Sequence, residues 1–194
     1  MRPIFTIHAG EFLAADYIER NYAKDGLRVW VPSKDDGIDL LVTSNDCRHA
    51  VSLQVKFSKN FGRNRDCDAS GWWLINRNKI RTSKADYWVF VLPKSFGKKM
   101  FSDCCYILIR PKELLRRMDK IHHTTDKHGN YNTYFTMKDS VAIETRGVRP
   151  SGIAQQLRDP HGTRDFSKFL GAWDHTLRRL LAKKRVLKTP ARRK

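Results

Sequence analysis

The chain has 194 residues and a mass of 22.7 kDa, which favours one domain built around one hydrophobic core. Hydrophobic residues make up 40% of the sequence, which excludes wholesale disorder, collagen and coiled coil. The formal net charge of +18 indicates a large polyanion as partner, and nucleic acid is favoured over an anionic membrane surface.

No apolar stretch is long enough to span a bilayer. The longest runs, 87–92 and 104–109, fall far below the roughly 20 residues that a transmembrane helix needs. The N-terminal stretch is too short and too polar for a secretory signal. Without a CxxC pair the cysteines predict reduced thiols, and the spacing of Cys47, His49 and Cys67 matches no usual zinc pattern. We therefore expect a cytoplasmic protein without membrane contact, nucleoid-associated if it is prokaryotic.

The first part of the chain predicts one helix and a three-stranded meander. Residues 8–24 place apolar side chains at helical spacing, and Asp25-Gly26 ends the helix. Three β-rich runs follow at 27–31, 38–43 and 51–57, with turn residues between them. The polar stretch 58–71 contains two glycines and predicts a mobile loop.

The next part predicts a helix at 76–84 and two strands at 87–92 and 106–109. Both strands are nearly continuous apolar runs, which suits strands that are buried on both faces. Pro111 begins a helix that extends to about Lys120, because proline is well tolerated in a first turn. After a loop over 122–132, the segments 131–136 and 141–144 predict a small hairpin.

The C-terminal part predicts one long amphipathic helix over 164–184. Residues 158–194 contain 12 Lys and Arg against 3 Asp, so half of the net charge lies there. The elements together predict an α/β fold with a central mixed sheet flanked by helices, then a C-terminal helix and a basic tail. We expect a core over 1–147, a helical extension over 148–184 and the tail over 185–194.

Four polar residues interrupt apolar patterns in three consecutive predicted elements. Glu11 lies on the apolar stripe of the first helix, Asp39 lies in the second strand, and Gln54 and Lys56 lie in the third. Gln54 and Lys56 share one face of their strand because side chains alternate. Each residue alone has an ordinary explanation, such as a helix-dipole partner, a turn cap or a gatekeeper on an edge strand. Buried charges are costly unless they are paired, so their joint order favours one shared site.

This order of residues resembles the PD-(D/E)XK nuclease superfamily, which includes type II restriction endonucleases and archaeal Holliday-junction resolvases. The matching residues are Glu11, Asp39 and the triplet Gln54-Val55-Lys56, and the resemblance covers roughly residues 8 to 110. Two positions depart from the family pattern, since Ile38 replaces the proline and Gln54 replaces the acid of the triplet. Some branches of the superfamily resemble this chain in using Gln-x-Lys. The resemblance implies a restriction-endonuclease-like fold.

The resemblance also implies a Mg²⁺-dependent endodeoxyribonuclease. The metal ligands would be Glu11, Asp39, the side-chain oxygen of Gln54 and the backbone carbonyl of Val55, because Mg²⁺ prefers hard oxygen donors. Lys56 would orient the attacking water and stabilise developing negative charge. Because Gln54 is neutral, we expect weak Mg²⁺ binding and better activity with Mn²⁺.

The substrate implied is duplex or branched DNA, and a homodimer is expected for an enzyme that cuts both strands. Basic residues flank the proposed site and continue in the C-terminal helix, and Trp72 is an aromatic candidate for stacking on a base. The predicted nucleic-acid contacts are Lys59, Arg63, Arg65, Trp72, Arg77, Lys79, Arg81, Lys84, Arg178, Lys183, Lys184 and Arg185. Core packing is the ordinary explanation for Trp72 and its neighbour Trp73.

Two other functions fit the same sequence. A nuclease fold that has lost hydrolysis would bind nucleic acid without cutting it, and Gln54 is the feature that permits this. A basic RNA-associated factor would use its tail for binding and keep the four polar residues for structure. A cleavage assay separates the first alternative from an active nuclease, and competition between RNA and DNA separates the second.

Overall fold

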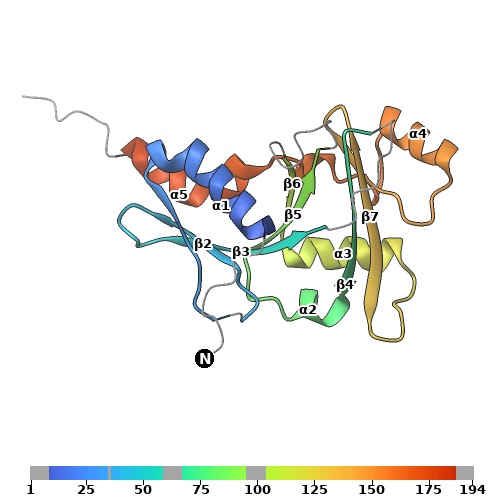
Figure 1. The fold of residues 1–194 in the computed structure, drawn as a ribbon, viewed down its shortest axis with the longest axis horizontal. Helices are drawn as coiled ribbons and strands as arrows, with labels where there is room; N and C mark the ends of the chain where they lie inside the picture. The colour runs from blue at the N-terminus through green and yellow to red at the C-terminus, as the bar shows by residue number, and fades with distance from the viewer. Residues whose placement is uncertain (1–8, 35, 59–66, 95–103, 187–194) are drawn as a thin grey trace, which may run out of the picture.

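The structure is a computed structural model that describes residues 9–34, 36–58, 67–94 and 104–186, and Figure 1 shows their arrangement. The helices are α1 (Ala9–Tyr22), α2 (Arg77–Arg81), α3 (Pro111–Ile121), α4 (Pro150–Arg158) and α5 (Trp173–Val186), with short 3-10 turns η1 (Ala23–Asp25) and η2 (Ser167–Phe169). The strands are β1 (Leu27–Trp30), β2 (Leu40–Ser44), β3 (Ala50–Phe57), β4 (Ala69–Asn76), β5 (Tyr87–Pro93), β6 (Cys104–Ile109), β7 (Asn130–Lys138) and β8 (Val141–Glu144). None of the helices in these ranges is long and apolar enough to cross a bilayer.

Five strands form a mixed sheet in the order β1-β2-β3-β5-β6. The β1-β2-β3 meander is antiparallel, as the turn-separated runs predict. The pair β3-β5 is parallel, and β5-β6 is antiparallel. The predicted mixed sheet within an α/β fold is therefore confirmed.

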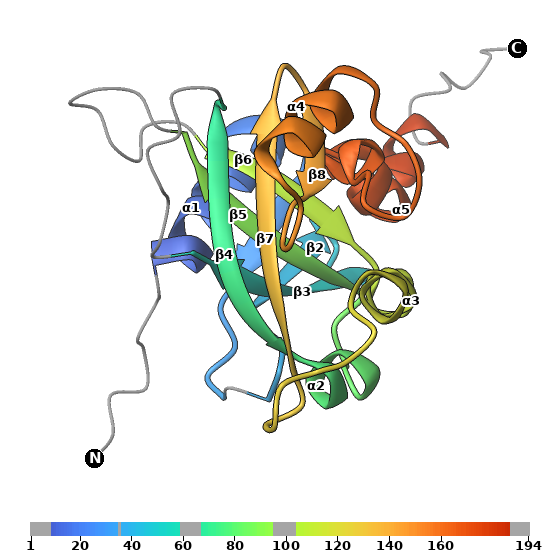
Figure 2. The same ribbon diagram turned by 90° about the vertical axis from the view of Figure 1, so that its right-hand side faces the viewer.

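A second sheet, β4-β7-β8, packs across one face of the first (Figure 2). The sequence predicts its β7-β8 hairpin but not β4. Residues 69–71 were expected to be a loop, and this is wrong because they pair with residues 135–137 of β7. Residues 59–66, the centre of that predicted loop, lie outside the described residues. Helices alone therefore do not flank the central sheet, since a second sheet covers part of one face.

Two apolar clusters cover the two faces of the first sheet. One cluster contains α1 and α5, which lie side by side in Figure 1, together with one set of side chains from β5. The other contains α3, β4 and β7 with the alternate β5 side chains Trp88, Phe90 and Leu92. All seven residues of β5 are buried, so the prediction of a strand buried on both faces is confirmed.

The C-terminal part departs from the predicted single helix. Helix α5 begins at Trp173, not at about 164, and α4 is an additional helix that the sequence pattern did not indicate. The apolar residues of 164–181 do not share one helical face, because Phe166 packs in the α3 cluster and Trp173 packs in the α1 cluster. Gly171 has a φ of 61° and separates the segment 164–170 from helix α5. The α5 face thus belongs to the core around α1.

Arg117 on α3 fixes the segment that precedes α5. Its side chain is 7% exposed, and Nη1 donates to the carbonyl oxygens of Thr163 at 2.7 Å and Asp165 at 2.6 Å. The guanidinium group also lies 5.0 Å from the ring centres of both Phe166 and Phe169. The acid that balances this charge is Glu113, one helical turn earlier, at 2.8 Å from Nε.

Glu113 generates a prediction for the dependence of stability on pH. The hydrogen bond from Arg116 is the main cause that lowers the pKa of Glu113 to about 2, and Arg117 adds to it. A lowered pKa stabilises the folded state above the ordinary carboxyl pKa, and this contribution disappears as the pH falls toward 2. Glu113→Gln should therefore lower the free energy of unfolding by about 1–2 kcal/mol at pH 7, after allowance for the partial exposure of the pair.

Urea denaturation of both proteins at pH 7, 5 and 3 measures this difference. It should be largest at pH 7 and shrink at pH 3. A difference that is constant over this range would mean that the charge of Glu113 contributes no stability.

Candidate active site

The pairing of β2 with β3 brings Asp39 beside the Gln54-Val55-Lys56 triplet. Asp39 directly precedes β2, and its backbone N–H donates to the Leu53 carbonyl oxygen at 2.8 Å. Its carboxylate Oδ2 accepts hydrogen bonds from the Val55 backbone N–H at 2.6 Å and from Gln54 Nε2 at 2.5 Å. A carboxylate from one strand is thus bound to the backbone and to a side chain of the next.

Lys56 lies on the same face of β3 as Gln54. Alternate residues of the strand, including Leu53 and Val55, point into the cluster around α1, so Gln54 and Lys56 occupy the other face. Both are half-buried. The Lys56 Nζ atom lies 5.3 Å from the ring centre of Trp88, the β5 residue that pairs with Gln54. This cation–π contact holds the ammonium group against the sheet near the Asp39–Gln54 pair.

Glu11 belongs to α1, which packs on the face of the sheet opposite to Gln54 and Lys56. It lies half-buried in the first turn of α1, next to Gly10. A Cβ atom at Gly10 would lie 2.5 Å from the Phe57 Cβ atom, so the helix and the strand approach closely there. Phe57 directly follows Lys56. The structure therefore joins Asp39, Gln54 and Val55 by hydrogen bonds and puts Lys56 on the face of Gln54, whereas Glu11 comes from the helix that covers the other face.

The predicted ligands are oxygen donors of the type that a hard divalent cation prefers. Asp39 and Glu11 offer carboxylate oxygens, and Gln54 and the Val55 carbonyl offer neutral oxygens, which is the oxygen-only set that Mg²⁺ prefers. Within the described ranges, no group of three or more His, Cys, Asp or Glu side chains is placed to hold a metal ion. That result includes the zinc combination of Cys47, His49 and Cys67. A metal at the strand end would depend on Gln54 in place of a third carboxylate.

A basic segment borders the site through an ion pair. The Lys84 Nζ atom lies 2.5 Å from Oδ2 of Asp36, three residues before Asp39. The hydrogen bond and the positive charge of Lys84 lower the pKa of the Asp36 carboxyl. Ser83 accepts a hydrogen bond from Trp88 Nε1 at 2.9 Å. The same Trp88 ring forms the cation–π contact with Lys56. The segment after α2 is therefore fixed next to the proposed site.

The predicted nucleic-acid contacts differ in their surroundings. Lys79 and Arg81 are exposed on α2, and Arg178 is exposed on α5. Arg77 forms a two-pronged ion pair with Asp119 at 2.9 and 3.2 Å, so this guanidinium group has a structural partner. Lys59, Arg63 and Arg65 lie outside the described residues, as do the side chains of Lys183, Lys184 and Arg185.

Trp72 and Trp73 occupy opposite faces of β4. Trp73 is 6% exposed and packs against Phe90 and Phe135, so it is a core residue. Trp72 is half-buried on the other face, and its Nε1 donates to Asn132 Oδ1. The stacking role remains a prediction for Trp72 alone.

Trp88 is a site residue that the sequence analysis did not identify. It looks like an ordinary core residue in an apolar run. Its position beneath Lys56 follows from the parallel register of β3 and β5, which links residues 34 positions apart. No local pattern in the sequence indicates that register.

Comparisons with protein-family models, with curated proteins and with solved structures found no match for this chain. The interpretation of the site therefore depends on the residues of this chain and on their contacts.

Gly10→Ala tests the close approach of α1 to β3. Alanine favours a helix by about 1 kcal/mol relative to glycine, but the new methyl group would overlap Phe57 Cβ. The variant should lose about 1–2 kcal/mol of unfolding free energy in urea denaturation. The matched control is Gly152→Ala in α4, where the nearest atom is the Val148 Cγ1 methyl at 3.1 Å, which can rotate away. Equal stabilisation of both variants would contradict the tight contact.

Gln54→Glu tests the role of the amide beside Asp39. The change replaces the hydrogen-bond donor with a second carboxylate 2.5 Å from Oδ2, so in EDTA the variant should lose about 1–3 kcal/mol. Millimolar Mg²⁺ should raise its melting temperature more than that of the wild type, because a cation relieves the repulsion and stabilises by mass action. Gln54→Met, which loses the hydrogen bond without adding charge, is the control. An identical response of both variants to Mg²⁺ would exclude a metal at this position.

Proposed function

We propose that this protein is a metal-dependent DNA endonuclease of the PD-(D/E)XK, restriction-endonuclease-like type. The observation that supports this most is the pair of hydrogen bonds from Gln54 and Val55 to the Asp39 carboxylate. They join the acid before β2 to the Gln-x-Lys triplet of β3.

In this proposal each site residue has a separate task. Asp39, Glu11, Gln54 and the Val55 carbonyl hold Mg²⁺ or Mn²⁺, which supplies a Lewis acid for the phosphate and an activated water. Lys56 donates hydrogen bonds to the attacking water or to the phosphate oxygens. Trp88 limits the freedom of the Lys56 side chain, so less ordering is needed when substrate binds.

The proposed path of the DNA backbone runs over α2 and the segment after it. Lys79 and Arg81 are exposed there, and Lys84 is bound to the chain just before Asp39. Phosphate contacts of this kind supply affinity without sequence information. The proposed substrate is therefore duplex or branched DNA, and the compartment is the cytoplasm.

A second candidate, a nuclease fold that binds DNA without cutting it, is favoured by one observation. The Gln54 amide donates to the same Asp39 oxygen that accepts the Val55 N–H, so this oxygen already has two donors. An amide in this position stabilises the acid without any metal. A protein that has lost hydrolysis would retain this arrangement.

A cleavage assay with the full chain distinguishes the two functions. The substrates are supercoiled plasmid and a four-way junction, incubated in Mg²⁺, Mn²⁺ or EDTA, with RNA as a competitor. The active enzyme should cut in Mn²⁺ at least as well as in Mg²⁺ and not in EDTA. Asp39→Ala and Lys56→Ala should each lose about 100-fold or more in rate while binding of DNA is retained. Lys112→Ala, which removes an exposed lysine from α3, should cut like the wild type.

Three outcomes would count against the proposal. Equal cutting by all variants would mean a contaminant or another active site. Binding without cutting by every protein, including the wild type in Mn²⁺, would support the inactive alternative. Stronger competition by RNA than by either DNA would indicate an RNA-associated factor.

A further inference from the structure

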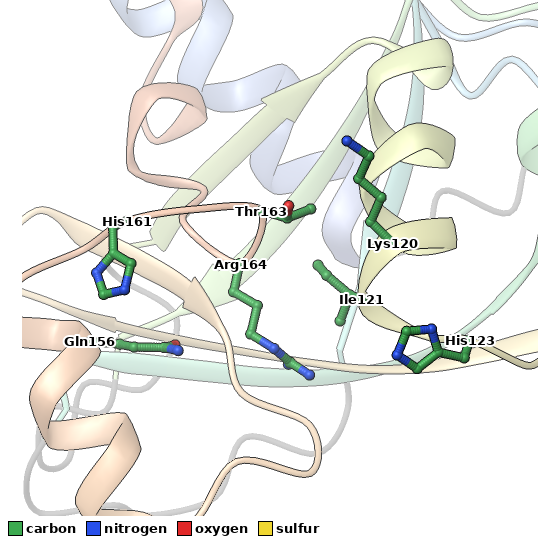
Figure 3. A pocket seen from close by; sticks show the side chains of 7 residues that line it. All are labelled: Lys120, Ile121, His123, Gln156, His161, Thr163 and Arg164. Carbon is green, nitrogen blue, oxygen red and sulfur yellow. The ribbon is translucent and has the colours of Figure 1, made fainter.

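A polar pocket, separate from the candidate active site, lies between the C-terminal end of α3, helix α4 and the loop that follows α4. Its volume is about 340 Å³, and Figure 3 shows the side chains that line it. The lining residues are Lys120, Ile121, His123, Gln156, His161, Thr163 and Arg164. None of them belongs to the candidate active site or to the predicted nucleic-acid contacts.

The lining is cationic. Lys120 and Arg164 carry permanent positive charge, two further residues are histidines, and no Asp or Glu is among the seven. In Figure 3, Lys120 and His123 lie on the α3 side, His161 and Gln156 lie on the opposite side, and Arg164 lies between them. Side chains from α3, α4 and the loop after α4 thus line one hollow, and its two permanently charged groups, Lys120 and Arg164, are both cations.

Arg164 is held in place by a fully buried acid. Glu144 is 0% exposed, and Arg164 Nη1 donates to its Oε2 and, at 3.2 Å each, to the carbonyl oxygens of Glu144 and Arg146. Burial raises the pKa of Glu144 to about 7, and the charge of Arg164 opposes this most. Each of these three bonds uses Nη1. The guanidinium group is therefore fixed in position before any ligand arrives, which lowers the entropy cost of binding.

His122, which also lies beside Glu144, carries no positive charge that would compete with Arg164 for this carboxylate. His122 Nε2 lies 3.6 Å from Glu144 Oε1, too far for a hydrogen bond, and burial together with Arg164 lowers its pKa to about 4. The imidazole of His122 is thus neutral at pH 7. Arg164 remains the main partner of Glu144.

The polar groups of the pocket can be oriented toward an anion. His161 Nδ1 lies 2.8 Å from the Asp159 carbonyl oxygen, so Nδ1 carries the proton of that bond and the ring is held in one orientation. Gln156 Oε1 is buried and has no hydrogen-bond partner within the described part of the chain. This oxygen is an acceptor, so its partner would be an ordered water or a donor group and not an anionic oxygen. Only the Nε2 group of this amide can donate a hydrogen bond to an anion.

We propose that this pocket binds a phosphate group, with Lys120, Arg164 and His161 as its main contacts. The Lys120 ammonium group, the fixed Arg164 guanidinium group and the imidazole groups in the lining are the groups that bind a compact anion. Inorganic phosphate, the 5′-terminal phosphate of a nucleic acid and an internal phosphodiester share this chemistry. The proposal needs neither Asp39 nor a metal ion, so it is independent of the proposed nuclease activity.

The test is titration calorimetry of the full chain in EDTA, where metal-dependent cleavage cannot occur. The probes are inorganic phosphate and one short single-stranded DNA with a 5′-phosphate or a 5′-hydroxyl. Lys120→Ala/His161→Ala removes two exposed contacts and leaves the Arg164–Glu144 pair intact. Lys112→Ala/His175→Ala, which removes the same residue types from exposed positions on α3 and α5, is the matched control.

The pocket variant should bind at least one probe tenfold more weakly, and the control and Asp39→Ala should bind like the wild type. A loss confined to the 5′-phosphorylated DNA would identify a terminal phosphate. A loss for both DNAs would identify a phosphodiester, and a loss for inorganic phosphate would identify a small-molecule site. Equal affinities of pocket variant and control for all three probes would overturn the proposal, whatever the outcome of the cleavage assay.

Discussion

Burial of β5 on both faces is the constraint on which the rest of the fold depends. Its alternate side chains enter two separate clusters, so each face of the central sheet needs its own cover. Helices α1 and α5 cover one face, and the second sheet with α3 covers the other. The half-buried Gln54 and Lys56 lie on the second face, in a strand whose other side chains reach the α1 cluster. Polar groups can be both fixed and accessible at such a border.

In the proposed nuclease, the residue at position 54 would set a balance between the stability of the site and its affinity for a metal ion. A carboxylate at position 54 would add charge for a cation but would repel Asp39 when no cation is bound. The amide reverses both effects, since it donates to Asp39 and carries no charge. In the proposed nuclease, weak metal binding and a metal-free site that is stable by itself would both follow from the amide at position 54. This is why the active and the inactive versions of the proposed function share one geometry.

Much of this arrangement follows from local patterns in the sequence. The meander, β5, β6, α1 and α3 are marked by periodicity and by turn residues, and the position of Asp39 relative to the triplet follows from antiparallel pairing. Strand β4, which completes the second sheet, was missed because it pairs with β7 across about 60 residues. Ser70 and Gly71 also look like loop residues. The last helix was predicted too long, because hydrophobic residues on both sides of Gly171 serve two different clusters. Periodicity shows that a segment is apolar, but not which core it joins.

The net positive charge is known from the sequence, but the role of each positively charged residue depends on its contacts in the fold. The high net charge attracts any polyanion at long range, and this effect depends little on the position of each residue. Contacts at short range depend on partners. Arg117 is bound to Glu113 and to carbonyl groups that hold α3 and the segment before α5, so its charge stabilises the fold. Arg164 is also bound to an acid, but a pocket lies beside it, so in the proposed phosphate site the same type of ion pair would present a fixed cation to the ligand. The ion pair alone therefore does not distinguish the two roles, and the proposed role of Arg164 depends on the hollow beside its pair.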